Sequence, residues 1–268
     1  MTIGKAIGLG FITARDFLAR GLVRLGVTPN GLTMAGMVIT AGAGVCYALG
    51  AGREHFGWDW DRHAGRNAWL LLAGALMVLA SACDMLDGAV ARIGDKKTTF
   101  GAFLDSTLDR FSDFVVYAGI AVYYAAASPV NVTYCLLAML AFFNSFMISY
   151  ARARAEDLID HCTIGYWQRG ERSAAILIGT FAYNVPAILM QQGLSTMFTA
   201  LRRMSYTQSV LAGRTPIEDP RQGGWWLKVR LWRWPRMTWA YDLVTGINIA
   251  FLIFARIPSY DPLGTWLR

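Results

Sequence analysis

The sequence is poor in charged residues and has no grouping of cysteine or histidine. Charged residues make up 16% of the 268 residues, whereas soluble domains usually contain about 25%. The cysteines, which are Cys46, Cys83, Cys135 and Cys162, have no paired spacing, and the three histidines are scattered. These absences argue against a redox or metal role for the cysteines, which we interpret as small apolar residues, the first three of them within predicted spans.

The chain is instead rich in long hydrophobic runs. Hydrophobic residues make up 55% of the chain, and the mean hydropathy is +0.35. Apolar stretches of about 20 residues, the length that spans a bilayer as a helix, are centred on six parts of the chain. They cover approximately 31–50, 68–90, 101–126, 130–150, 173–192 and 238–256. The sequence therefore predicts an all-α membrane protein with six transmembrane helices.

The segment before the first apolar stretch is basic, with Lys5, Arg15, Arg20 and Arg24. It lacks the short apolar region and small-residue cleavage site of a signal peptide, so we expect it to be retained. We interpret it as an amphipathic N-terminal juxtamembrane helix. Because basic residues favour the cytoplasmic side, the second span should end, and the third begin, at the cytoplasmic face.

The formal charge of +7 admits two kinds of partner, nucleic acid or membrane lipid. In a chain with six apolar spans, basic residues usually mark membrane ends and contact anionic headgroups. No nucleic-acid-binding motif is present. We therefore expect membrane lipids, and not nucleic acid, as partners.

Four aspartates stand at helical spacing around the predicted cytoplasmic connection between the second and third spans. Asp84 and Asp87 are three residues apart, and Asp105 and Asp109 are four apart, so each pair shares a helix face. Four carboxylates within apolar sequence repel one another and are costly to desolvate unless cations neutralise them. Oxygen ligands without histidine or cysteine favour Mg²⁺ or Mn²⁺, and paired ions of this kind commonly handle phosphate.

Arginines are frequent in the connection between the fourth and fifth stretches, which is predicted to lie at the same membrane face. Arginine donors suit phosphate groups, although ordinary positive-inside topology explains such residues equally well. The basic residues of this connection are Arg152, Arg154, Arg169 and Arg172.

Residues 193–236 form a second basic segment, which is also rich in tryptophan. The count of six spans places it on the opposite side of the membrane, against the positive-inside bias. Two explanations stay open: a segment that lies on the bilayer surface, or a fifth stretch that re-enters without spanning. We therefore divide the chain into a core of residues 1–192, a basic insert of 193–236, and a sixth span with a tail in 237–268.

The aspartates belong to the longer pattern D-x-x-D-G-x-x-A-R, eight residues, G-x-x-x-D-x-x-x-D. This pattern resembles the motif of the CDP-alcohol phosphatidyltransferase family at every fixed position, and Thr28-Pro29-Asn30 resembles the entry to that family's first span. The fixed positions are Asp84, Asp87, Gly88, Ala91, Arg92, Gly101, Asp105 and Asp109. The resemblance implies a six-helix membrane enzyme, usually a homodimer, which transfers a phosphatidyl-type group from a CDP-linked lipid to an alcohol and releases CMP.

The resemblance also implies roles for individual residues. Asp84, Asp87 and Asp105 would hold two divalent ions, while Asp109 would join the second ion and act as the general base. Residues implied in binding the CDP-linked lipid are Asn30, Thr33, Gly88, Ala91, Arg92 and Gly101. The small residues among them leave room for a nucleotide, although close helix packing is an alternative reason for their size.

The acceptor is suggested by the arginine-rich connection. The run from Ser149 to Glu156 resembles the S-Y-x-R-A-R-A-E segment of the branch of this family that uses inositol phosphate. The acceptor-binding candidates are Ser149, Arg152, Arg154, Arg169 and Arg172. Gln168 departs from the glutamate usual in that branch, and Tyr166 and Trp167 before it are bulkier than expected.

We therefore predict a transferase of a prokaryotic inner membrane that uses CDP-diacylglycerol and a phosphorylated polyol, namely inositol phosphate, with its active site facing the cytoplasm. The nearest alternative is a phosphatidylglycerol-phosphate synthase, whose acceptor is glycerol 3-phosphate, and an acceptor without phosphate is a further one. Alternatives from other classes are a divalent-cation transporter and a catalytically silent protein with the same fold.

Overall fold

The structure is a computed structural model that describes residues 3–51, 68–214, 225–232, 234, 236, 238–255, 257 and 261–267. In these ranges all regular elements are α-helices, which confirms the predicted class. The helices are α1 (Ile3–Arg24), α2 (Pro29–Gly50), α3 (Ala68–Ile93), α4 (Thr99–Ala126), α5 (Val132–Glu156), α6 (Arg169–Phe181), α7 (Val185–Leu194), α8 (Met197–Leu211), α9 (Trp225–Leu231), α10 (Trp239–Phe254) and α11 (Pro262–Leu267).

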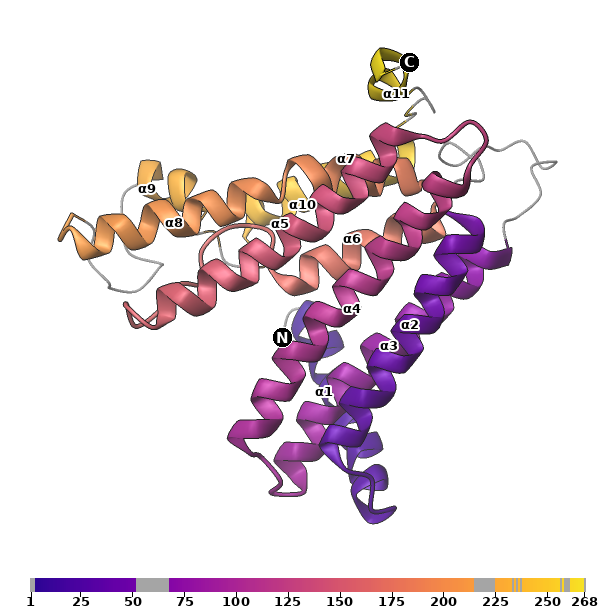
Figure 1. Cartoon of the computed structure of the whole chain (residues 1–268). Coiled ribbons are helices and arrows are strands. Elements are labelled where there is room, and N and C mark those ends of the chain that lie inside the picture. The colour runs from indigo at the N-terminus through magenta and orange to yellow at the C-terminus, as the bar shows by residue number, and fades with distance from the viewer. Residues whose placement is uncertain are drawn as a thin grey trace.

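The helices form two groups joined along α4 and α5 (Figure 1). In the first group α2 packs against both α3 and α4, and α1 packs against α3 through Ala19, which lies with Ala89 and Val90 in a small apolar cluster. In the second group α5 packs against α7 and α8, while α6 lies between α3, α7 and α10. Because α6 contacts both groups, its residues can reach the aspartates of the first.

Three helices, α2, α3 and α5, are long and apolar enough to cross a membrane, and α10 is a shorter apolar helix. The chain is therefore a membrane protein. Helix α4 has 28 residues, but it carries Asp105, Asp109 and Asp113, which lower its hydropathy. The first four apolar stretches of the sequence correspond to the helices α2 to α5, and only residues 130 and 131 precede their helix.

The prediction of one continuous span over residues 173–192 is wrong. The chain reverses between α6 and α7, where Tyr183 adopts a left-handed φ of 55°. Asn184 caps α7 by accepting from the Ala187 amide at 3.3 Å, and it donates to the carbonyls of Leu252 and Ala255 at 3.0 and 2.9 Å. Hydropathy does not detect this turn, because apolar residues continue on both sides of it.

The described part of residues 193–236, whose side of the membrane the sequence left open, begins in helices that pack back toward the aspartate end of the bundle. Arg203 of α8 is fully buried and donates to the carbonyls of Ile148 and Ile164 and to the Gln168 side chain. These partners are the end of α5 and the connection to α6, the region predicted to lie beside the site. The reversal before α7 explains this return. The proposed domain boundary at residue 192 falls inside α7.

Helices α2 and α4 approach closely at two glycines. A Cβ atom on Gly119 would collide with the backbone of Gly44, and one on Gly44 would lie 2.7 Å from the Val115 carbonyl oxygen. Backbone atoms cannot move aside as a flexible side chain can, so both glycines are needed for this contact. The contact matters for the site because α2 and α4 each supply residues to it.

We predict that Gly119→Ala destabilises the protein by about 1–3 kcal/mol, because it overpacks the contact between α2 and α4. The measurement is thermal unfolding of the purified protein in detergent. Gly246→Ala in α10 is the matched control, since a Cβ there meets nothing within 4 Å. Equal unfolding temperatures for the two variants would contradict the predicted contact.

Asp261 ties the end of the chain to the start of α5. Its carboxylate accepts from the amides of Val132 and Thr133 at 3.1 and 2.9 Å and from the Thr133 hydroxyl at 2.6 Å. Desolvation, which raises the pKa of Asp261, is outweighed by these bonds and by one from the Gly264 amide, and together they lower the pKa to about 2. The ionised carboxylate also suits the positive end of the helix dipole.

We predict that Asp261→Asn lowers the unfolding temperature most at neutral pH. The pKa of Asp261 is depressed from 3.8 to about 2 in the folded state, so its stabilisation is complete above pH 4 and disappears as the pH falls toward 2. The difference in unfolding temperature between the two proteins should shrink over that interval. A difference that stays constant from pH 7 to pH 3 would argue against this role.

Candidate active site

The end of α3 and the start of α4 bring three aspartates together. A tight connection joins the two helices, and the hydroxyl of Thr98 caps α4 by accepting from the Gly101 amide at 2.9 Å. Asp84, Asp105 and Asp109 each place one carboxylate oxygen within 4.8 Å of the others. The predicted convergence of the two aspartate pairs is therefore present for three of its four members.

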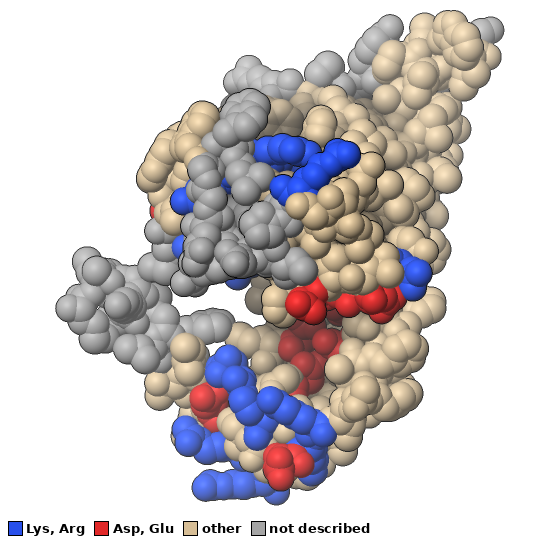
Figure 2. Space-filling view, turned by 90° about the vertical axis from the view of Figure 1, so that its left-hand side faces the viewer, with Lys and Arg blue, Asp and Glu red and all other residues tan. Residues whose placement is uncertain are grey.

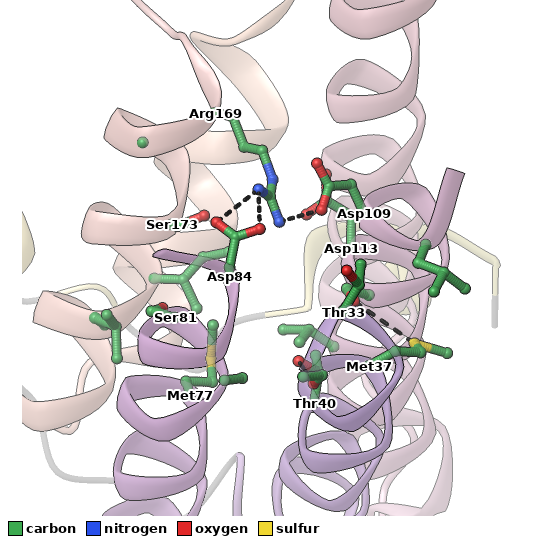
Figure 3. Close-up of a pocket in the computed structure, with 18 of the residues that line it drawn as sticks. Thr33, Met37, Thr40, Met77, Ser81, Asp84, Asp109, Asp113, Arg169 and Ser173 are labelled. Carbon is green, nitrogen blue, oxygen red and sulfur yellow. Dashed lines mark hydrogen bonds and ion pairs between the residues drawn. The ribbon is translucent and has the colours of Figure 1, made fainter. Parts of the chain in front are cut away.

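Arg169, the first residue of α6, lies between two of these carboxylates (Figure 3). Its Nη1 is 2.8 Å from Asp84 Oδ1 and 3.0 Å from Asp84 Oδ2, and its Nη2 forms an ion pair with Asp109. Arg110 lies further away, with Nη1 3.7 Å from Asp109 Oδ2. The Asp109 side chain is only 11% exposed, so positive charge beside it offsets much of the cost of its burial.

The other two carboxylates have different surroundings. Asp87 is buried and accepts from the Thr33 hydroxyl at 2.8 Å, which joins α3 to the start of α2. Asp105 Oδ1 is buried and has no hydrogen-bond partner among the described residues. A buried, unpartnered carboxylate oxygen beside two other carboxylates is suited to a hard divalent cation.

A cavity of about 440 Å³ lies against this cluster. Its lining comes from α2, α3, α4 and α6, and includes Thr33, Asp84, Asp87, Asp109 and Arg169. In the space-filling view, acidic side chains gather at a hollow in the middle of one face, with basic side chains above and below it (Figure 2). The hollow therefore offers carboxylates for cations and nearby basic residues for anionic substrates.

A second cavity, of about 480 Å³, adjoins the first, and the two share Thr33 and Asp87. Among the residues predicted to bind the CDP-linked lipid, those lining it are Asn30, Thr33, Gly88, Ala91 and Gly101. Arg92 is outside the lining. A Cβ on Gly88 would meet nothing within 4 Å, which leaves free space along this face of α3.

The predicted acceptor-binding residues are not all at the site. Arg169 lines the first cavity, and Arg172 lies 3.5 Å from Asp113, which also lines it. Arg152 and Arg154 instead pair along the end of α5 with Glu156 and Asp157, and they do not line either cavity, nor does Ser149.

Two site-related residues were missed from the sequence. Asp113 extends the four-residue spacing of Asp105 and Asp109 by one more turn, and this spacing could have identified it. It accepts from the Ser145 hydroxyl at 2.5 Å and faces Arg172. Arg203 had no sequence signal, because its partners are mostly backbone carbonyls that only the fold brings near.

Gln168 has a structural role at the start of α6. Its amide donates to the carbonyls of Ile164 and Gly165 at 3.2 and 2.8 Å, and its oxygen accepts from Arg203 at 2.8 Å. The side chain therefore braces the turn that leads into Arg169, and it does not line either cavity of the site.

Comparisons with known proteins agree with this geometry. The family model described as CDP-alcohol phosphatidyltransferase matches residues 26–206, and the chain belongs to that family. The archaetidylinositol phosphate synthase of Methanothermobacter thermautotrophicus is 33% identical over 189 residues, which cover 68% of this chain and 84% of that protein. The phosphatidylinositol phosphate synthase of Streptomyces avermitilis is 32% identical over 201 residues, which cover 70% of this chain and 74% of that protein.

Solved structures with a similar fold include the phosphatidylinositol phosphate synthase of Mycobacterium tuberculosis. The form with CDP-DAG bound has a TM-score of 0.60 and 27% identity, and the match covers 73% of this chain and 94% of that one. The form in complex with manganese and citrate has a TM-score of 0.59 and 26% identity, and covers 73% of this chain and 89% of that one. Helices α9 to α11 lie beyond the residues matched by the family model.

Proposed function

We propose that this protein is an integral membrane transferase that moves a phosphatidyl group from CDP-diacylglycerol to inositol phosphate and releases CMP. The observation that carries the proposal is the cluster of Asp84, Asp105 and Asp109 between two adjoining cavities. Membership of the CDP-alcohol phosphatidyltransferase family supports the reaction class, and the related inositol phosphate synthases support the acceptor.

The carboxylates fit divalent cations, because they offer hard oxygen donors and include the unpartnered Asp105 Oδ1. We assign Asp84, Asp87, Asp105 and Asp109 as the residues that would hold two Mg²⁺ or Mn²⁺ ions. When bound, such ions neutralise the diphosphate and make the attacked phosphorus more electrophilic. The manganese in the related mycobacterial structure supports this assignment.

The chain's own residues account for binding and proton transfer. The second cavity, with Asn30, Gly88 and Gly101, receives the nucleotide end of the CDP-linked lipid. The acceptor hydroxyl attacks the phosphorus that carries the lipid, a new P–O bond forms, and the P–O bond to CMP breaks. Asp109, in the largely enclosed part of the site, accepts the proton of that hydroxyl.

Arginines beside the first cavity recognise the phosphate of the acceptor. Arg169 already lies at the carboxylate cluster, and Arg172 is one helical turn further along α6. Their forked donors suit a phosphate dianion, whereas a neutral polyol has no anionic group for them to bind. Ser149, Arg152 and Arg154 line neither cavity, and we propose that their part is to attract anionic acceptors before binding.

The membrane arrangement we propose has six crossings in the family core, made by α2, α3, α4, α5, α6 and the pair α7–α8. Helix α10 is then an added membrane helix, since its end meets Asn184 in the turn between α6 and α7. The site faces the cytoplasm at the inner membrane, α1 lies along that surface, and the enzyme works as a homodimer.

We predict that the purified protein with magnesium releases CMP from CDP-diacylglycerol fastest with inositol 1-phosphate. Parallel reactions with glycerol 3-phosphate, free inositol and serine identify the acceptor class. Preference for glycerol 3-phosphate would keep the transferase but change its acceptor. Absence of release with every acceptor would contradict the transferase assignment.

We predict that Asp109→Asn reduces CMP release by about 100-fold or more, because the hydroxyl loses its base, while much of the CDP-lipid binding remains. Initial rates and equilibrium binding of the lipid substrate separate the two effects. Asp95→Asn is the matched control, because Asp95 is exposed in the connection between α3 and α4 and lines neither cavity. Near-normal turnover by Asp109→Asn would exclude this residue as the base.

A further inference from the structure

We propose that Arg236, which lies beyond the region matched by the family model, is a positioning residue for the acceptor-binding arginines of α6. This inference rests on the proposed function. Arg236 precedes α10 and holds Glu171 in the first turn of α6. Through Glu171 it sets the position of the backbone that carries Arg169 and Arg172.

Arg236 contacts this turn at Glu171 and at Gly170. Its Nη2 lies 2.7 Å and its Nε 2.9 Å from Glu171 Oε1. The Tyr241 hydroxyl of α10 donates to the same oxygen at 2.7 Å. A Cβ on Gly170 would lie 3.3 Å from Arg236 Nη2, so the guanidinium lies directly over the backbone next to Arg169.

Glu171 needs this partner. Its side chain is 7% exposed, and a carboxylate buried to this extent without a cation is strongly destabilised. Arg169 and Arg172, its neighbours in the sequence, are directed to Asp84, Asp109 and Asp113 instead. Arg236 is the cation that pairs with Glu171 among the described residues.

Two cavities border the first turns of helix α6, where Arg236 contacts it. One side borders the cavity at the aspartates, and the other borders a cavity of about 300 Å³ formed with α10. Gly170 and Ala174 line both cavities. Between these two cavities, the ion pair and the Tyr241 hydrogen bond supply a directional restraint on the first turn of α6.

Loss of the Arg236 contact should affect binding of the acceptor and not binding of the CDP-linked lipid. Arg169 and Arg172 bind the acceptor phosphate, whereas the nucleotide cavity is lined by α2, α3, α4 and their connections, which Arg236 does not touch. Displacing the first turn of α6 should weaken acceptor binding and leave CDP-lipid binding largely intact. A residue that served only global stability would alter both.

The test is steady-state kinetics on the full-length protein with CDP-diacylglycerol and its preferred phosphorylated acceptor. We expect Arg236→Gln to raise the acceptor KM about tenfold or more, with the CDP-lipid KM within about twofold of wild type. Arg236→Lys should recover part of the loss, since an ammonium can still pair with Glu171. Arg230→Gln is the matched control, because Arg230 is exposed and contacts only the Ser205 hydroxyl, at 3.2 Å, among the described partners.

A double-mutant cycle examines the route through Glu171. If Arg236 acts through that carboxylate, adding Arg236→Gln to Glu171→Gln should raise the acceptor KM little further. Tyr241→Phe, which keeps the ion pair, provides a milder variant with a smaller rise and remains informative if Arg236→Gln fails to fold. Unfolding temperatures identify such a failure.

The outcomes separate the two proposals. A wild-type protein that releases no CMP with any acceptor overturns the proposed function. An active wild-type protein whose Arg236→Gln and Tyr241→Phe variants behave like Arg230→Gln, or change both KM values equally, overturns the positioning role alone.

Discussion

The structure depends on neutralising carboxylates that the fold places in a membrane-embedded bundle. Asp84, Asp105 and Asp109 converge within 4.8 Å, and like charges so close repel one another unless cations neutralise them. Arg169 supplies one positive charge from a different helix. The position of α6, and of whatever holds α6, is therefore part of the chemistry of the site.

Much of the remaining architecture supports this arrangement. The close contact of Gly44 with Gly119 holds α2 against α4, which carries Asp105 and Asp109, while the hydrogen bond from Thr33 to Asp87 joins α2 to α3. Arg203 ties the end of α5 to the turn before α6 by donating to the carbonyls of Ile148 and Ile164. In each case a polar or backbone contact provides the direction that apolar packing in a membrane does not supply.

The reversal at Tyr183 and Asn184 changes how the second half of the chain is organised. It converts one apolar stretch into two helices and returns α8 to the site. Arg203, in the described part of the basic segment after α7, then lies beside the arginine-rich connection, with Ile164 and Gln168 as partners. When residues 173–192 are taken as one helix, the count of six spans separates the basic segment from the arginine-rich connection, and this produces the conflict with the positive-inside bias.

The sequence by itself determined the helical class, the first four apolar helices and the aspartate cluster, because hydropathy and i, i+3 or i, i+4 spacing are local properties. It also determined the family, through fixed positions within 26 residues of one another. The tertiary structure alone decided that Arg169 reaches the aspartates while Arg152 and Arg154 pair along α5. The partners of Arg203 and Arg236 are distant in the sequence, so only the packing of helices could reveal them.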